Sequence, residues 1–139
     1  MSDYGLEVLD RDECERLLAT QLVGRVAVYG ARPGVFPVLF GLLDGDVVFR
    51  TAPGEKLMAA ALNREVVFEV DAFDVTRRTG WSVNVRGAAE EIDDPAERAR
   101  AEGLGLDPWA GELRDRYVRV RGTEITGRRV STTADHMRV

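Results

Sequence analysis

Residues 50–56, with the sequence Arg-Thr-Ala-Pro-Gly-Glu-Lys, carry side chains that suit a phosphate group. A guanidinium can hold a phosphate in a bidentate fork, an ammonium attracts it as a point charge, and free N–H groups at a helix start donate hydrogen bonds to it. If Arg50 and Thr51 end a strand and Lys56 opens a helix, these groups surround one small volume. The segment therefore predicts a phosphate site, and the residues alone leave a solvated surface as the alternative.

Lys56 is the only lysine of the chain, since all the other basic residues, out of 19 in total, are arginine. An ammonium and a planar guanidinium are not interchangeable, so a single lysine suggests a place that needs a compact charge, and chance is the alternative. The spacing is not that of a triphosphate-binding loop. Lys56 follows Glu55 and precedes Leu57, whereas such a loop reads G-x-x-x-x-G-K-[ST].

The composition gives little support to other kinds of site. Cys14 is the only cysteine and His136 the only histidine, which excludes an internal disulfide and a Cys/His zinc cluster. Cys14 falls on the apolar side of a predicted helix and is interpreted as a core residue. The net charge of −5 argues against a nucleic-acid binder, which needs a basic face. We therefore expect an organic cofactor, no metal and no nucleic-acid partner.

The elements that would position the phosphate-binding groups are mostly strands. Apolar alternation, β-branched and aromatic residues and the Asp44-Gly45 turn predict the strands, and capping signals predict the helices. Pro37 cannot donate to a ladder, so its strand should lie at an edge or bulge there, open to a ligand. Strands are expected at residues 24–29, 35–40, 46–51, 65–70, 81–88, 117–121 and 124–130, with the last two paired, a loop at 72–80, and helices at 11–21, after Gly54 and after Asp94.

This order of elements predicts a mainly β (α+β) fold, a small closed barrel with a few short flanking helices, because the strand-helix alternation of a doubly wound sheet is missing. The length of 139 residues suits a single domain over residues 1–139, in which 131–139 are expected to form a loose tail. No apolar run reaches about 18 residues, and the acidic start lacks a signal-peptide pattern. We therefore expect a cytoplasmic protein with no membrane partner.

The order of several short motifs resembles that of the pyridoxamine 5′-phosphate oxidase-like FMN-binding split-barrel family. The resemblance extends from about residue 9 to residue 130 and implies a six-stranded antiparallel split barrel. The motifs are Glu13-Cys14-x-x-Leu17-Leu18, Gly24-Arg25-Val26-Ala27, Phe36-Pro37-Val38-x-Phe40, Val48-Phe49-Arg50-Thr51 with Gly54-x-Lys56, Phe68-Glu69-Val70-Asp71, and Gly80-Trp81-Ser82-Val83-x-Val85-Arg86-Gly87.

The resemblance implies a flavin site shared by two subunits of a homodimer. It assigns the FMN phosphate to Arg50, Thr51 and Lys56. The strand that carries Pro37, Val38 and Leu39 would run beside the isoalloxazine ring. Trp81, Ser82 and Arg86 would complete the pocket from the partner chain.

Two departures from the family pattern bear on the activity. The residues after Gly127-Arg128-Arg129 do not match the family's substrate-phosphate pattern, which argues against oxidation of pyridoxamine phosphate. Glu55 stands where a second cation is often found, which leaves room for the deazaflavin F420. The leading hypothesis is a homodimeric FMN-dependent oxidoreductase acting on an unidentified small molecule. An F420-binding reductase, a flavin-binding carrier or sensor without turnover, and a ligand-free barrel are the alternatives.

Overall fold

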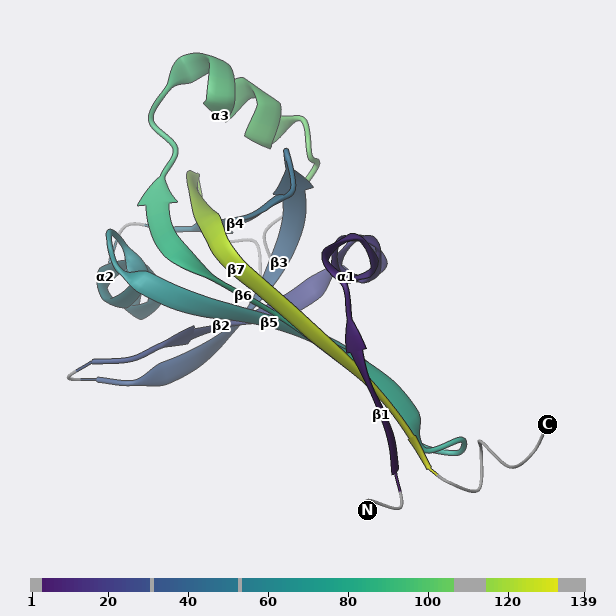
Figure 1. Cartoon of the computed structure of the whole chain (residues 1–139). Coiled ribbons are helices and arrows are strands. Elements are labelled where there is room, and N and C mark those ends of the chain that lie inside the picture. The colour runs from purple at the N-terminus through teal and green to yellow at the C-terminus, as the bar shows by residue number, and fades with distance from the viewer. Residues whose placement is uncertain (1–3, 31, 53, 107–114, 133–139) are drawn as a thin grey trace.

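The computed structural model describes residues 4–30, 32–52, 54–106 and 115–132, which form one antiparallel β-barrel with three short helices (Figure 1). The strands are β1 (Tyr4–Leu9), β2 (Val23–Val28), β3 (Gly34–Leu43), β4 (Asp46–Thr51), β5 (Glu65–Asp74), β6 (Thr79–Glu91) and β7 (Arg116–Thr132). The helices are α1 (Arg11–Leu18), α2 (Lys56–Ala61) and α3 (Pro95–Glu102).

Six strands close the barrel and a seventh extends it. The strands follow the order β1-β7-β4-β3-β2-β5-β6, and β6 also pairs with β7. This second pairing joins β2 to β7 in a closed ring, while β1 pairs with the end of β7 alone. The six-stranded antiparallel barrel predicted from the sequence is therefore confirmed, and β1 is an additional strand that the sequence patterns did not indicate.

The last strand is continuous, so the prediction of a strand pair at 117–121 and 124–130 is wrong. β7 runs from Arg116 to Thr132, and its register against β6 shifts between Arg86↔Glu124 and Gly87↔Gly122. The shift is a β-bulge, in which Thr123 is an extra β7 residue without a partner on β6. The Thr123 hydroxyl donates to the Arg86 carbonyl at 3.1 Å. The bulge lets one long strand bend with the barrel.

The hairpin of β5 and β6 is longer than predicted. Its ladder continues to the pair Asp74↔Thr79, so most of the loop expected at 72–80 is strand. The backbone N–H of Arg77 donates to the Asp74 carboxylate and stabilises the short turn at its tip. At the other end of the chain, Ser131 and Thr132 belong to β7, and the rest of the tail predicted to be loose, residues 133–139, lies outside the described residues.

The barrel core contains the buried face of α1. Asp10 caps this helix by accepting from the Glu13 N–H at 2.8 Å. Cys14 and Leu18 are fully buried and pack with the apolar side chains inside the barrel. Cys14 is thus a core residue, as predicted, and burial raises the pKa of its thiol, which keeps the sulfur protonated.

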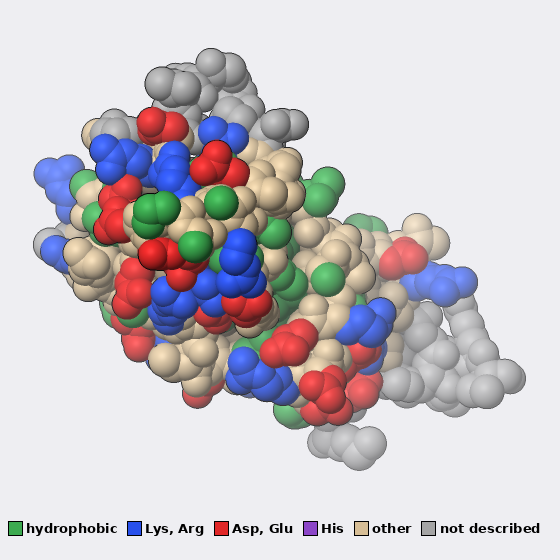
Figure 2. All heavy atoms as spheres, turned by 90° about the horizontal axis from the view of Figure 1, so that it is seen from above, with side chains coloured by type: hydrophobic (Ala, Val, Ile, Leu, Met, Phe, Trp, Pro, Cys, Tyr) green, Lys and Arg blue, Asp and Glu red, His purple; other side chains and the backbone are tan. Residues whose placement is uncertain are grey.

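The helix α3 covers a second apolar cluster outside the barrel, which includes Val48 and Tyr117. Arg119, only 6% exposed, joins this side of the barrel to α3 by ion pairs with Asp46 at 3.0 Å and Glu97 at 3.5 Å. Figure 2 looks onto the side of the molecule where α3 lies and shows acidic and basic side chains interleaved there. The arginines of this surface are matched by carboxylates.

Candidate functional site

The strands β3 and β4 separate where the sequence predicted a ligand. Their ladder runs from Leu43↔Asp46 to Phe40↔Phe49 and, among the described residues, goes no further. The rest of β3, which includes Pro37, is paired only with β2. The prediction that Pro37 lies at a sheet edge is therefore confirmed, because a residue without a backbone N–H occupies a strand with one open side.

A cavity of about 550 Å³ lies between α2 and the turn that joins β2 to β3. Lys56, the first residue of α2, lines it together with Ala59 and Ala60 of the same helix. The remaining lining residues are Tyr29, Arg32, Pro33, Phe36 and Arg64. Figure 1 shows α2 beside the long β2–β3 hairpin that forms the opposite wall. The volume is within the ordinary range for a small-molecule site.

The fold holds Lys56 at the mouth of this cavity through the buried side of α2. Leu57 and Ala61 are buried in the barrel core, which leaves Lys56 exposed on the other side of the helix. Gly54, with φ of 84°, supplies the left-handed turn before the helix. Asn63, with φ of 60°, follows the helix end.

The other two predicted phosphate ligands have contacts within the chain. The Arg50 guanidinium donates to the Leu106 carbonyl at 2.6 Å and lies over the Tyr117 ring, on the α3 side. Thr51 is fully buried, and its hydroxyl donates to Glu55 at 3.1 Å. Of the three residues, only Lys56 is among the described residues that line the cavity. A role of Arg50 and Thr51 in phosphate binding stays a prediction that requires these contacts to be exchanged.

The residues predicted to lie beside a ring system divide between two faces of the sheet. Val38 points into the barrel and is 7% exposed, so it offers no side-chain contact there. Pro37 and Leu39 alternate with it and point outward. Ser82 and Arg86 of β6 lie on this same outer face. The cross-strand pairs Pro37↔Arg25, Arg25↔Glu69 and Glu69↔Asn84 place Asn84 on the outer face, and Ser82 and Arg86 are each two residues from Asn84 on β6.

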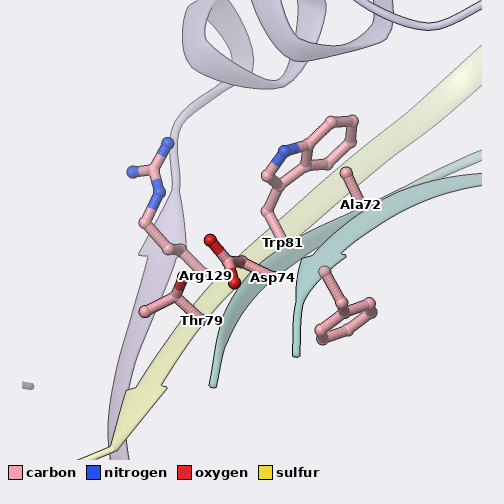
Figure 3. A pocket seen from close by; sticks show the side chains of 7 residues that line it. Ala72, Asp74, Thr79, Trp81 and Arg129 are labelled. Carbon is pink, nitrogen blue, oxygen red and sulfur yellow. The ribbon is translucent and has the colours of Figure 1, made fainter. Parts of the chain in front are cut away.

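Trp81 lies on the opposite face from Ser82 and Arg86, next to a second, shallower cavity of about 350 Å³. In Figure 3 its indole and the Arg129 guanidinium stand beside Asp74 and Thr79. Arg129 is already held by Glu13 at 2.7 Å and Glu7 at 3.3 Å. The three residues predicted to complete a partner's pocket therefore do not form one cluster within a subunit.

A charged cluster stands on the outer face next to Pro37. Arg25, the cross-strand neighbour of Pro37, pairs with Glu69 at 3.2 Å and with Asp71 at 3.6 Å. Burial, together with a hydrogen bond and the charge of Asp71, raises the pKa of Glu69 to about 7, against the lowering effect of Arg25. Glu69 can therefore change its charge near neutral pH. It lies on β5, which is separated from β3 and its open edge only by β2.

We expect Glu69→Gln to reduce the pH dependence of stability between pH 5 and 8. The folded protein holds the Glu69 proton more tightly than the unfolded chain does, so the free energy of unfolding of the wild type falls as the pH rises from about 4.5 to above 7. The glutamine variant lacks this fall. Urea unfolding at several pH values checks it, with Glu90→Gln as a matched surface control; equal slopes in all three proteins would contradict the raised pKa.

Sequence patterns missed two cations of the first cavity. Arg32 lies in the β2–β3 turn and Arg64 lies three residues after the end of α2, and neither belongs to one of the quoted motifs. Glu69 stood in a quoted motif, but its pKa is raised mainly by burial, which the motif alone does not reveal. Within the described ranges, no group of His, Cys, Asp and Glu side chains is placed to hold a metal ion. None of the described helices is long and apolar enough to span a bilayer.

Comparisons with known proteins show the family of this chain. The family model described as pyridoxamine 5′-phosphate oxidase matches residues 10–129. An uncharacterized protein of Mycobacterium tuberculosis is 40% identical over 128 residues, with 88% of this chain and 84% of that protein covered.

Two solved structures have the same fold and significant sequence identity. The FAD binding protein from Mycobacterium smegmatis is 41% identical with a TM-score of 0.79, and the match covers 88% of this chain and 98% of that one. A FAD-binding protein from Mesorhizobium loti is 27% identical with a TM-score of 0.74, over 92% and 98% of the two chains. The split-barrel fold predicted from the order of the motifs is thereby confirmed, and this chain belongs to the pyridoxamine 5′-phosphate oxidase family.

Proposed function

We propose that this protein binds a flavin nucleotide beside α2 and uses it in the oxidation or reduction of a small molecule. The observation that carries the proposal is the position of Lys56 in a cavity that reaches Phe36, next to the open edge of β3. A phosphate held by Lys56 would leave the ring system of the same molecule within reach of Pro37 and Leu39. The phosphate of a flavin nucleotide would thus meet a cation, and its ring system would meet the open edge of β3.

The similar proteins support the flavin. The Mycobacterium smegmatis and Mesorhizobium loti structures are named as FAD-binding proteins, at identities of 41% and 27%. The order of the sequence motifs favours FMN within the same class of cofactor. The isoalloxazine ring, which FMN and FAD share, supplies the hydride chemistry, and the protein supplies binding, orientation and the surrounding charges.

The residues around the cavity have defined tasks in this proposal. The Lys56 ammonium attracts a phosphate, and Phe36 with Ala59 and Ala60 offers an apolar wall. The Phe40 N–H donates to the Leu22 carbonyl, on the β2 side of β3. The backbone groups of successive strand residues point to opposite edges, so the residues that alternate with Phe40 direct theirs to the edge away from β2. The carbonyl of Pro37 is therefore placed to meet the polar edge of a ring.

A homodimer would bring the outer face of a second subunit to this edge. Val35, 65% exposed, lies on that face beside Arg25, Glu69 and Arg86. Apolar groups and charges of both signs on one surface suit a two-fold contact, in which each patch meets its own copy. Ser82 and Arg86 of the partner could then approach the flavin, as the sequence motifs predict.

Anaerobic reduction of the reconstituted protein tests the oxidoreductase activity. Protein loaded with FMN or FAD is mixed with NADH, NADPH or reduced F420, and the flavin absorbance is followed before and after an electron acceptor is added. Bleaching and recovery over repeated cycles, faster than with free flavin, is the expected result. A bound flavin that no donor reduces faster than free flavin would leave a carrier or sensor as the function.

A further inference from the structure

We infer that Arg32 and Arg64 form a subsite for the pyrophosphate and adenosine half of FAD, and that this subsite selects FAD over FMN. The inference rests on the proposed flavin binding and deepens it, because it names the cofactor that the cavity takes. Lys56 would serve both flavins, whereas Arg32 and Arg64 would contact only the longer one.

The cations of the cavity are spread over both of its walls. Lys56 begins α2 and Arg64 lies beyond its end, so the length of the helix, roughly 8 Å, separates their main-chain positions. Arg32 comes from the opposite wall, at the β2–β3 turn. The Arg64 guanidinium also reaches toward this turn, because its Nη1 lies 3.6 Å from where a Cβ on Gly30 would stand. Cations on two walls and at both ends of a helix suit an extended anion better than a single phosphate.

These three cations differ from most of the other described arginines, because they have no carboxylate partner among the described residues. Within the described part of the chain no ion pair is found for Arg32, Lys56 or Arg64, and no carboxylate lines their cavity. On the α3 side, by contrast, arginines are paired with acids, as Arg100 is with Asp44 at 2.6 Å. In a chain with a net charge of −5, three neighbouring unpaired cations form a local positive site. A negatively charged ligand would relieve their mutual repulsion.

The uncharged lining identifies the kind of anion. Phe36, Tyr29 and Pro33 present flat apolar surfaces, and Ala59 and Ala60 present small side chains that leave room beside them. Tyr29 is fixed by a hydrogen bond from its hydroxyl to Glu65. An aromatic base stacks well on such surfaces, whereas a chain of carboxylates needs none of them. Phosphates joined to adenine match this mixture of cations and apolar rings.

Affinities for FAD and FMN, measured by the change in flavin fluorescence, test the inference. The variants are the double variant Arg32→Gln/Arg64→Gln and, as a control that removes an exposed cation elsewhere, Arg77→Gln. We expect the wild type and the control to bind FAD more tightly than FMN. The double variant should bind FAD about tenfold more weakly, because two exposed charge contacts are lost, while its Kd for FMN stays within about twofold. Each single variant should lose about threefold for FAD alone.

The outcomes separate this inference from the flavin proposal itself. Equal losses for FAD and FMN, or no loss for FAD in either the double or the single variants, would overturn the subsite. A wild type that binds FMN and F420 but not FAD would overturn it as well, while leaving a flavin-type site in place. If the wild type binds none of the three, the proposed function fails. Melting temperatures of the cofactor-free variants within about 2 °C of the wild type show that folding is intact.

Discussion

Replacing Lys56 with alanine is expected to remove about half or more of the stabilisation that a bound flavin nucleotide gives this protein. A charge-assisted hydrogen bond contributes about 1.5–3 kcal/mol, so its loss weakens binding about tenfold to a hundredfold. With ligand at a hundred times the wild-type Kd, stabilisation of about 2.7 kcal/mol should fall to between about 1.4 and 0.4 kcal/mol. Thermal unfolding with and without FMN or FAD measures this difference.

Two controls show that the effect belongs to the Lys56 charge. Lys56 is exposed, so the melting temperature of the cofactor-free alanine variant should match that of the wild type. Lys56→Arg keeps the charge in another geometry and should recover part of the ligand effect. Arg77→Ala removes an exposed cation in the β5–β6 turn and should have no effect. If Lys56→Ala keeps the full stabilisation by both flavins, the phosphate does not bind at this residue.

Gly87→Ala is expected to lower the free energy of unfolding by about 3 kcal/mol or more, the largest stability effect that we predict. A Cβ on Gly87 would lie 2.0 Å from the Arg121 carbonyl oxygen and 3.1 Å from the Gly122 Cα. Both atoms belong to the backbone of β7 at the bulge, where neither strand can move without breaking the barrel ladder. Urea unfolding followed by circular dichroism measures the change.

Gly41→Ala is the matched control for this substitution. The nearest atoms to its added Cβ are the ends of the Leu104 and Leu106 side chains, at 3.2 and 3.4 Å, which can rotate away. Its cost should therefore stay below about 1 kcal/mol. Similar stabilities for the two alanine variants would show that the β6–β7 crossing tolerates a side chain, against the packing described here.

Elements that are specified by close neighbours in the sequence could be predicted. The helix α1 begins where Asp10 caps the Glu13 N–H, and the β3–β4 hairpin turns at Asp44 and Gly45, whose φ angles are both positive. Pro37 likewise indicates an open strand edge through its own chemistry. In each case the signal and the structure it specifies lie within a few residues of each other.

Elements that depend on distant pairing could not be predicted in the same way. β1 exposes Leu6 and Val8 and forms a strand because it pairs with the end of β7, more than a hundred residues later. Gly122 and Thr123 resemble a turn, yet the long partner strand β6 holds them in a bulge of one continuous strand. The pattern of residues within such segments does not contain the information about their partners.

The candidate site was predictable in part for the same reason. The residue types of segment 50–56 and its single lysine indicated Lys56 from the sequence, and this residue lines a cavity. The direction of Arg50 depends on Tyr117 and Leu106, which come from later segments of the chain. Arg32 meets Lys56 only because the β2–β3 hairpin folds back beside α2, whereas Arg64 comes shortly after the same helix.

The most direct test of flavin binding is to identify the small molecule carried by protein purified from its native host. The protein is denatured, and the released material is examined by absorbance and mass spectrometry. Preparations without bound material are incubated with FAD, FMN or F420 and dialysed before the same examination. We expect FAD, at about one molecule per chain, retained by the wild type and depleted in Lys56→Ala. Protein that carries no flavin and retains none after incubation would contradict it.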